Sequence, residues 1–212
     1  LVKSGSGERG IFNRIAAQNQ ASRWGRRSAD LDYGCNPCSE IILRDKQFCN
    51  LTEVVVRQSD TYNELKKKIE LATILGTYQS TLTDFKFLSE EWKKNTDEER
   101  LLGVSLTGIM DSPLLNGSKD AVLQHRELVR GLPTILQELR DHARKANIKW
   151  AERFNVPVST AITCVKPSGT VSQLCNSASG IHARFAPYYI RRIQLDKKDP
   201  VCQFLLDNGF PL

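Results

Sequence analysis

Stretches with helical spacing alternate with short apolar runs, and this alternation constrains the fold more than any other feature of the sequence. Apolar residues recur at three or four positions in 65–75 and in 136–150, which predicts two amphipathic helices. The apolar runs 102–109 and 159–165 suit buried strands. Strands that alternate with long helices predict an α/β fold with mainly parallel pairing. The predicted inner faces of the two helices consist of Leu65, Ile69, Ala72, Leu75, Leu136, Leu139, Ala143, Ala146 and Trp150.

Composition places the chain among ordinary globular proteins. Its 212 residues are 40% hydrophobic and 25% charged, which excludes a disordered or collagen-like chain. The net charge is +6, but basic residues are mixed with acidic ones, so we expect no nucleic-acid partner. No repeat or low-complexity linker divides the chain, and we expect one domain or part of one. Because residue 1 is a leucine, we expect residues 1–212 to be an internal piece of a longer protein.

Membrane and export signals are missing from the sequence. It has no apolar run of about 18 residues, and its first thirty residues lack the pattern of a signal peptide. We therefore expect a soluble, cytoplasmic protein without a membrane partner. In that compartment its six cysteines stay reduced unless they take part in redox cycling.

Residues 32–53 hold three of these cysteines. Pro37 excludes a regular helix there and favours a turn or loop, with 41–43 and 54–56 as the flanking strands. The first thirty residues predict loop and a short helix. Cys35 and Cys38 form a C-x-x-C motif with three interpretations: a zinc site, a redox pair, or two small thiols packed at a turn. Zinc lacks further ligands at a suitable spacing, and a redox pair normally precedes a helix.

A polar trio favours a functional interpretation of this segment. In an extended chain, side chains two residues apart point the same way, so Asn36, Cys38 and Glu40 are expected on one face. An amide, a thiol and a carboxylate that converge in this way can hold a polar ligand, offer a reactive sulfur and move a proton.

A second candidate site follows the predicted strand 159–165. Its residues are Pro167, Ser168, Gly169, Thr170, Val171 and Ser172. Small residues after a strand leave backbone N–H groups free to bind phosphate oxygens, and Lys166 and Arg184 add positive charge nearby. The same composition is also common in ordinary turns.

These motifs resemble the catalytic chain of the ribonucleotide reductases. The family's Asn-x-Cys-x-Glu motif is matched by Asn36, Cys38 and Glu40, and its cysteine in a Cys-Asn-Leu context is matched by Cys49. The segment 167–172 is similar to the family's substrate-phosphate loop, and the similarity extends through 105–108 and 179–182.

The resemblance implies a fold and a set of roles. The fold is a ten-stranded α/β barrel, of which 1–212 is the central part, with a finger loop that carries Cys38 inside it. Cys38 becomes the thiyl radical that abstracts the 3′-hydrogen in a buried pocket, Glu40 takes the 3′-hydroxyl proton, and Asn36 binds the sugar. Cys49 is one of two reducing thiols, and its partner lies upstream of residue 1. The substrate is a ribonucleotide, and no metal ligand is implied in this segment.

The resemblance also implies a radical source. Residues 167–172 and 179–184 look most like the adenosylcobalamin-dependent branch, with an external dithiol such as thioredoxin as reductant. The alternative is the branch fed by a metal-containing subunit, but Tyr188 and Tyr189 lie too close to the phosphate loop to match its tyrosine relay. Tyrosines near a strand are more often core or rim residues.

The remaining candidates have simpler interpretations. His125 and His142 are predicted surface or hydrogen-bonded helix residues, and His182 is a candidate hydrogen-bond partner of the phosphate loop. The run 90–100 predicts a solvated helix face, and Arg26-Arg27 a surface pair or a phosphate contact. Cys164, Cys175 and Cys202 are expected to act as small apolar residues. The rival functions are a basic nucleic-acid-binding module and a zinc-stapled structural domain.

Overall fold

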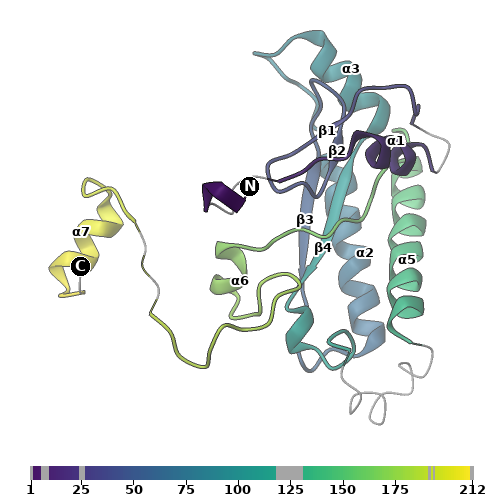
Figure 1. The fold of residues 1–212 in the computed structure, drawn as a ribbon. Coiled ribbons are helices and arrows are strands. Elements are labelled where there is room, and N and C mark those ends of the chain that lie inside the picture. The colour runs from purple at the N-terminus through teal and green to yellow at the C-terminus, as the bar shows by residue number, and fades with distance from the viewer. Residues whose placement is uncertain are drawn as a thin grey trace.

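A computed structural model describes residues 2–5, 10–23, 27–117, 131–190, 192 and 194–210. The described helices and strands confirm the predicted α/β class (Figure 1). In chain order they are α1 (Arg14–Ser22), β1 (Gly34–Cys35), β2 (Ile42–Leu43), β3 (Asn50–Val55), α2 (Tyr62–Gln79), α3 (Glu90–Glu99), β4 (Leu102–Thr107), α5 (Leu132–Arg153), α6 (Thr170–Leu174) and α7 (Pro200–Asp207), with short 3₁₀ helices at Val2–Ser4 and Ile109–Asp111.

The central sheet consists of β3 and β4, which pair in parallel from Asn50↔Leu102 to Val55↔Thr107. β3 begins four residues before the predicted strand 54–56 and ends at Val55. The predicted strand 159–165 lies beside β4 but forms only one bridge, between Val104 and Thr163. Within the described residues these strands form no closed barrel, so the ten-stranded barrel stays a prediction.

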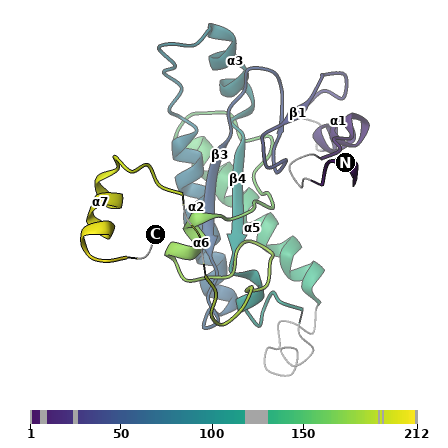
Figure 2. The same ribbon diagram turned by 60° about the vertical axis from the view of Figure 1, so that its left-hand side comes forward.

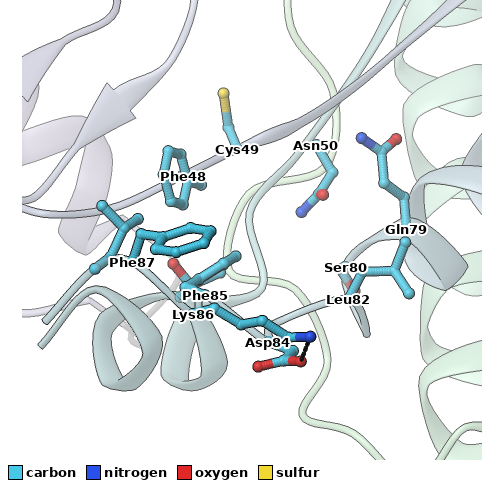
Figure 3. A pocket seen from close by; sticks show the side chains of 12 residues that line it. Phe48, Cys49, Asn50, Gln79, Ser80, Leu82, Asp84, Phe85, Lys86 and Phe87 are labelled. Atoms are coloured by element: carbon cyan, nitrogen blue, oxygen red, sulfur yellow. Dashed lines mark ion pairs between the residues drawn. The ribbon is translucent and has the colours of Figure 1, made fainter. Parts of the chain in front are cut away.

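The segment between β2 and β3 is held by aromatic contacts. Phe48 stacks on Trp92 of α3 with 4.7 Å between ring centroids, and it meets Phe85 edge-on at 5.0 Å. Phe85 belongs to the loop that follows α2, and Figure 3 shows it beside Phe48 and close to Cys49. Aromatic pairs of this kind add about 0.5–1.5 kcal/mol beyond the area that they bury. They fix the approach of the chain to β3.

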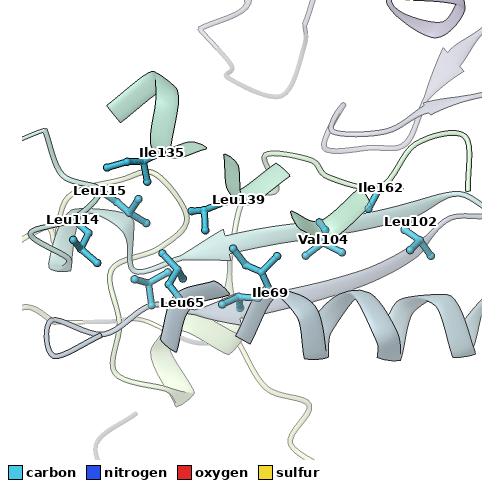
Figure 4. Close-up of a cluster of buried hydrophobic side chains, with 12 residues drawn as sticks. Leu65, Ile69, Leu102, Val104, Leu114, Leu115, Ile135, Leu139 and Ile162 are labelled. Atoms are coloured by element: carbon cyan, nitrogen blue, oxygen red, sulfur yellow. The ribbon is translucent and has the colours of Figure 1, made fainter. Parts of the chain in front are cut away.

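Helix α2 lies against the β3–β4 sheet, and α5 lies beside α2 (Figures 1 and 2). The helix α2 starts with a capping box between Thr61 and Glu64, which satisfies backbone N–H groups of its first turn. The apolar core fills the space between the helices and the sheet (Figure 4). Each fully buried Leu or Ile side chain contributes roughly 1.5–3 kcal/mol. The core residues are Val54, Val56, Leu65, Ile69, Leu102, Val104, Leu114, Leu115, Ile135, Leu139, Ala143 and Ile162.

The predicted helix faces were wrong at two positions. Leu75 is 61% exposed and Leu136 is 42% exposed. Where α2 meets α5, the buried contact is partly polar. Asn147 of α5 donates a hydrogen bond of 2.9 Å to the hydroxyl of Thr77 of α2. An apolar periodicity cannot reveal a buried polar contact between helices.

The C-terminal part of the described chain runs away from the sheet to α7 (Figures 1 and 2). Cys202 in α7 is buried, as expected of a small apolar residue. Among the described helices, none is both long and apolar enough to span a bilayer.

Candidate active site

Cys38 lies in a turn and not in the extended stretch that the alternation of Asn36, Cys38 and Glu40 predicted. The strands β1 and β2 form an antiparallel hairpin, with Cys35 opposite Ile42. The turn closes with a 2.9 Å hydrogen bond from the Ser39 amide to the Asn36 carbonyl. Pro37 suits the second position of such a turn because its ring fixes φ near −65°. Cys38 is exposed, which differs from the expected buried pocket, since no described segment covers it.

The turn still brings the side chains of Asn36 and Glu40 together. The Asn36 side-chain oxygen accepts a 3.0 Å hydrogen bond from the Ile41 amide, which fixes the amide group beside Glu40. The turn thus brings the amide and the carboxylate of the predicted trio together, through backbone contacts that a strand would not make, and leaves Cys38 exposed.

Glu40 forms an ion pair that links the hairpin to the predicted phosphate loop. Its carboxylate accepts a 2.7 Å hydrogen bond from the Lys166 ammonium, and its side chain is 0% exposed. Burial alone raises the pKa of Glu40, but the hydrogen bonds from Lys166, its own backbone and Asn36 outweigh burial and leave the pKa lowered. Glu40 is thus held as a carboxylate, the form that can accept a proton.

The hairpin packs on the sheet face opposite the helices. Val54, Leu102 and Val104 point into the helix-side core, so the alternate residues point the other way. On that other face Gly103 lies opposite Leu51. A methyl group at Gly103 would lie 2.4 Å from Leu51, 3.0 Å from Ile41 and 3.1 Å from the sulfur of Cys164. Only a residue without a side chain leaves room here for Ile41, the neighbour of Glu40.

Cys49 and Cys164 lie near Glu40 on this same side. Burial, and then the negative charge of Glu40, raise the pKa of the Cys49 thiol, while Lys166 opposes the rise. Burial raises the pKa of Cys164 to about 12, with smaller contributions from Glu40 and Cys49. Cys164 is thus a buried, neutral thiol, as expected of a small apolar residue, and the structure adds that it lies near the charge of Glu40. Cys175 is only partly buried and lies outside this cluster.

A buried ionic cluster holds the hairpin against α3. Arg27 contacts Glu99 at 2.9 Å, and their side chains are 3% and 5% exposed. Arg27 also donates to the Ile42 carbonyl at 3.0 Å, and Gln47 donates to Glu99 at 2.7 Å. The predictions of a surface or phosphate-binding Arg27 and of a fully solvated 90–100 face were therefore wrong. Buried charges of this kind need partners, and here the partners lie far apart in sequence.

The predicted phosphate loop runs from Pro167 into the five-residue helix α6. Ser168 and Ser172 are buried, and the Ser172 hydroxyl donates to the Gly169 carbonyl at 2.8 Å. Gly169 and Thr170 are exposed, and a methyl group at Gly169 would meet nothing within 4 Å. Both serines are therefore turned inward, and the Ser172 hydroxyl supports the loop, while its open side is the backbone at 169–171.

The loop is held against β4 by Gly180. Its φ is +54°, and a methyl group here would lie 3.1 Å from the Lys166 carbonyl. The Gly180 amide donates to the Thr107 hydroxyl at 2.7 Å, at the carboxyl end of β4. Glycine alone satisfies both the close approach and the backbone conformation without strain.

The other predicted residues lie outside this cluster. Arg184 pairs with Asp111 at 2.9 Å, and His182 makes a backbone hydrogen bond to Ser179. Tyr188 is 94% exposed, so it is not a core residue, and Tyr189 bonds Gln173. The Nε2 atom of His142 lies 3.4 Å from the Glu70 carboxylate, a contact between two helices and not a ligand site. His125 and Arg26 lie outside the described residues.

An open apolar cavity of about 680 Å³ lies beside Cys49 (Figure 3). Its apolar walls come from Phe48 and from the loop after α2, and Cys49 and Asn50 also line it. The described residues hold no group of three His, Cys, Asp or Glu side chains placed to bind a metal ion.

Comparison with known proteins shows which sequences this chain resembles over nearly its whole length. The chain is 30% identical to the adenosylcobalamin-dependent ribonucleoside-triphosphate reductase of Lactobacillus acidophilus over 97% of its length. It is 28% identical to the reductase of the same name from Lactobacillus gasseri over 97%, and 28% identical to a probable one from Dictyostelium discoideum over 85%. No protein-family model matches the sequence.

The chain belongs to the ribonucleotide reductases. It spans about 30% of the length of the two bacterial relatives. A crystal structure of a B12-dependent (class II) ribonucleotide reductase shares its fold, with a TM-score of 0.53 and 22% identity over 74% of the chain.

Sequence reasoning missed three features of this reductase segment: Lys166 as the partner of Glu40, Cys164 beside Cys49, and the Arg27–Glu99 pair. Each pair joins elements that are distant in sequence, 126 residues apart for Lys166 and Glu40. No local pattern could have found these contacts, because only the folded sheet brings their elements together.

Proposed function

We propose that this chain is the central part of a catalytic barrel that reduces ribonucleotides to deoxyribonucleotides by thiyl-radical chemistry. One observation carries the proposal: the turn that contains Cys38 holds the Asn36 amide beside a buried, ionised Glu40 carboxylate, and the Cys49 thiol lies near that carboxylate. The names of the relatives support a ribonucleoside triphosphate as the substrate.

Cys38 starts and ends the cycle in this proposal. As a thiyl radical it takes the 3′-hydrogen atom of the ribose, and it returns that atom to the deoxyribose at the end. Glu40 accepts the proton of the 3′-hydroxyl, which its ionised state permits. Asn36 donates a hydrogen bond to the sugar from its amide nitrogen, since its oxygen is already occupied by the Ile41 amide.

Cys49 supplies reducing equivalents together with a second thiol upstream of residue 1. The 2′-hydroxyl is protonated and leaves as water, and the two thiols lose two electrons and two protons to become a disulfide. An external dithiol such as thioredoxin then reduces the disulfide, and its own thiols are oxidised.

Adenosylcobalamin is the cofactor that we propose, because the relatives named above depend on it. When bound, it supplies the one-electron oxidation that turns the Cys38 thiol into a radical. The cytoplasmic location expected from the sequence goes with this proposal.

The loop at 167–172 is our candidate for binding the substrate phosphates. The backbone around Gly169 is open, and the buried Ser172 hydroxyl holds the loop in shape through the Gly169 carbonyl. Bound there, the phosphates would place the ribose on the side of the sheet where Glu40 and Lys166 meet.

The substitution Cys38→Ser in the complete reductase tests the function. We expect no deoxyribonucleotide above background, because a hydroxyl O–H bond is too strong to yield the radical that sulfur forms. Cys35→Ser is the matched control, since Cys35 lies three residues away in β1 and has no role in the scheme. Turnover by Cys38→Ser at the rate of the control would rule out the proposed reaction.

A further inference from the structure

We propose that Lys166 is a positioning residue for the reduction, which holds the Glu40 carboxylate in place as the proton acceptor and does not bind substrate phosphate. The inference rests on the proposed function. It assigns a role to a residue that sequence analysis treated only as positive charge near the phosphate loop.

The contacts of Lys166 favour a role in holding Glu40 over a role in binding substrate phosphate. The Lys166 ammonium donates to Glu40 at 2.7 Å, and the Glu40 side chain is fully removed from solvent. A buried carboxylate without a cationic partner favours its neutral, protonated form. The lysine therefore favours the ionised form of a proton acceptor at a place where burial favours the protonated form.

The backbone of Lys166 is itself fixed by contacts with the segment around Gly180. Its carbonyl packs against Gly180, and the Gly180 amide is bonded to Thr107 at the end of β4. The ammonium is thus carried on a backbone anchored to the sheet, while the hairpin that carries Glu40 is anchored through Arg27 to α3. Two separately supported segments meet at this one ion pair.

Other titratable groups around the pair are thiols. Cys49 and Cys164 lie near Glu40, and Cys38 lies near Lys166. Lys166 is the cation among the groups that act on Glu40 in the described chain. Loss of the Lys166 charge is therefore expected to change the pKa of Glu40 more than the pKa values of the thiols.

The first test is the pH profile of kcat/KM for Lys166→Met in the complete reductase. We expect the acid-side midpoint to move up by about 1 pH unit or more, because an opposite charge at this distance lowers a carboxyl pKa by about that much. Lys166→Arg, which keeps the charge, should restore the parental midpoint. Lys68→Met is the matched control, because Lys68 forms an equally short ion pair with Asp60 away from the site.

A phosphate-binding lysine would behave differently. Its removal would raise KM across the whole pH range and leave the acid-side midpoint in place, and that result overturns the inference.

A second test needs no turnover and uses the alkylation rate of Cys49 in the resting protein, measured by mass spectrometry. At pH 8, where the Glu40 carboxyl is ionised with or without its partner, loss of the Lys166 ammonium should slow alkylation, because Lys166 lowers the pKa of Cys49. Glu40→Gln should speed it, because Glu40 raises that pKa. General loosening of the fold would speed alkylation in both variants, and faster alkylation in both overturns the inference. An inactive Cys38→Ser protein with an unshifted Lys166→Met profile would refute this role alone and leave the proposed function standing.

Discussion

The two faces of the β3–β4 sheet differ in the residues that pack against them: one side is aliphatic, and the other carries charged groups and thiols. The face toward α2 and α5 buries aliphatic side chains, among them Leu65, Leu102 and Val104 (Figure 4). The other face carries Gly103, and the Glu40–Lys166 pair and two thiols lie on this side. The contrast teaches that one strand can serve stability and chemistry together, because neighbouring side chains point to opposite faces.

The faces also differ in how their contacts were encoded. Apolar periodicity reveals most of the helix side, since most buried positions there gain the same hydrophobic free energy. The hairpin side depends on single contacts, such as the space above Gly103. The following predictions test whether the two sides respond differently to change.

The largest expected effect concerns the thiol of Cys164. With a pKa of about 12 against an ordinary 9.0, its thiolate fraction at pH 8 is on the order of a thousandfold smaller than that of a free thiol. Iodoacetamide should therefore modify Cys164 that much more slowly in the folded protein than in the urea-unfolded protein. Mass spectrometry of both samples measures the ratio. Equal rates would contradict the burial of the Cys164 thiol on the hairpin side of the sheet.

The next effect concerns the anchor of the hairpin. Arg27→Met leaves Glu99 buried without its closest cationic partner, which costs about 3 kcal/mol. Hydrogen exchange of the amides in 34–43 should then be on the order of 100-fold faster, while α2 keeps its protection. Asp32→Asn removes the exposed pair with Arg14 and should change exchange less than about fivefold. Similar exchange in both variants would contradict a hairpin held by the buried pair.

The smallest effect compares two glycines that touch opposite faces of the sheet. Gly103→Ala must displace Leu51, Ile41 or Cys164, and we expect turnover to fall on the order of tenfold because Ile41 adjoins Glu40. Gly76→Ala meets only ordinary contacts at 3.5 Å, and alanine in a helix gains up to about 1 kcal/mol over glycine. We expect it to leave turnover unchanged. Steady-state assays of both variants check this. An equal loss of turnover in both would contradict the claim that only the hairpin side of the sheet supports the reaction.

Local pattern in the sequence determined the helices, the parallel pairing and the family. The periodicity of 65–75 and the run 102–109 predicted α2 and β4 because burial imposes a regular spacing on each element. The motif Asn36–Glu40 predicted a reactive trio, although it lies in a turn where alternation had suggested an extended chain.

Tertiary structure alone decided which groups meet. The Glu40–Lys166 and Arg27–Glu99 pairs, and the neighbourhood of Cys49 and Cys164, each join segments that are distant in the chain. A charged side chain carries no sign in the sequence of whether it will be solvated or buried against an opposite charge. That outcome depends on which elements the sheet brings together, and only the folded chain contains this information.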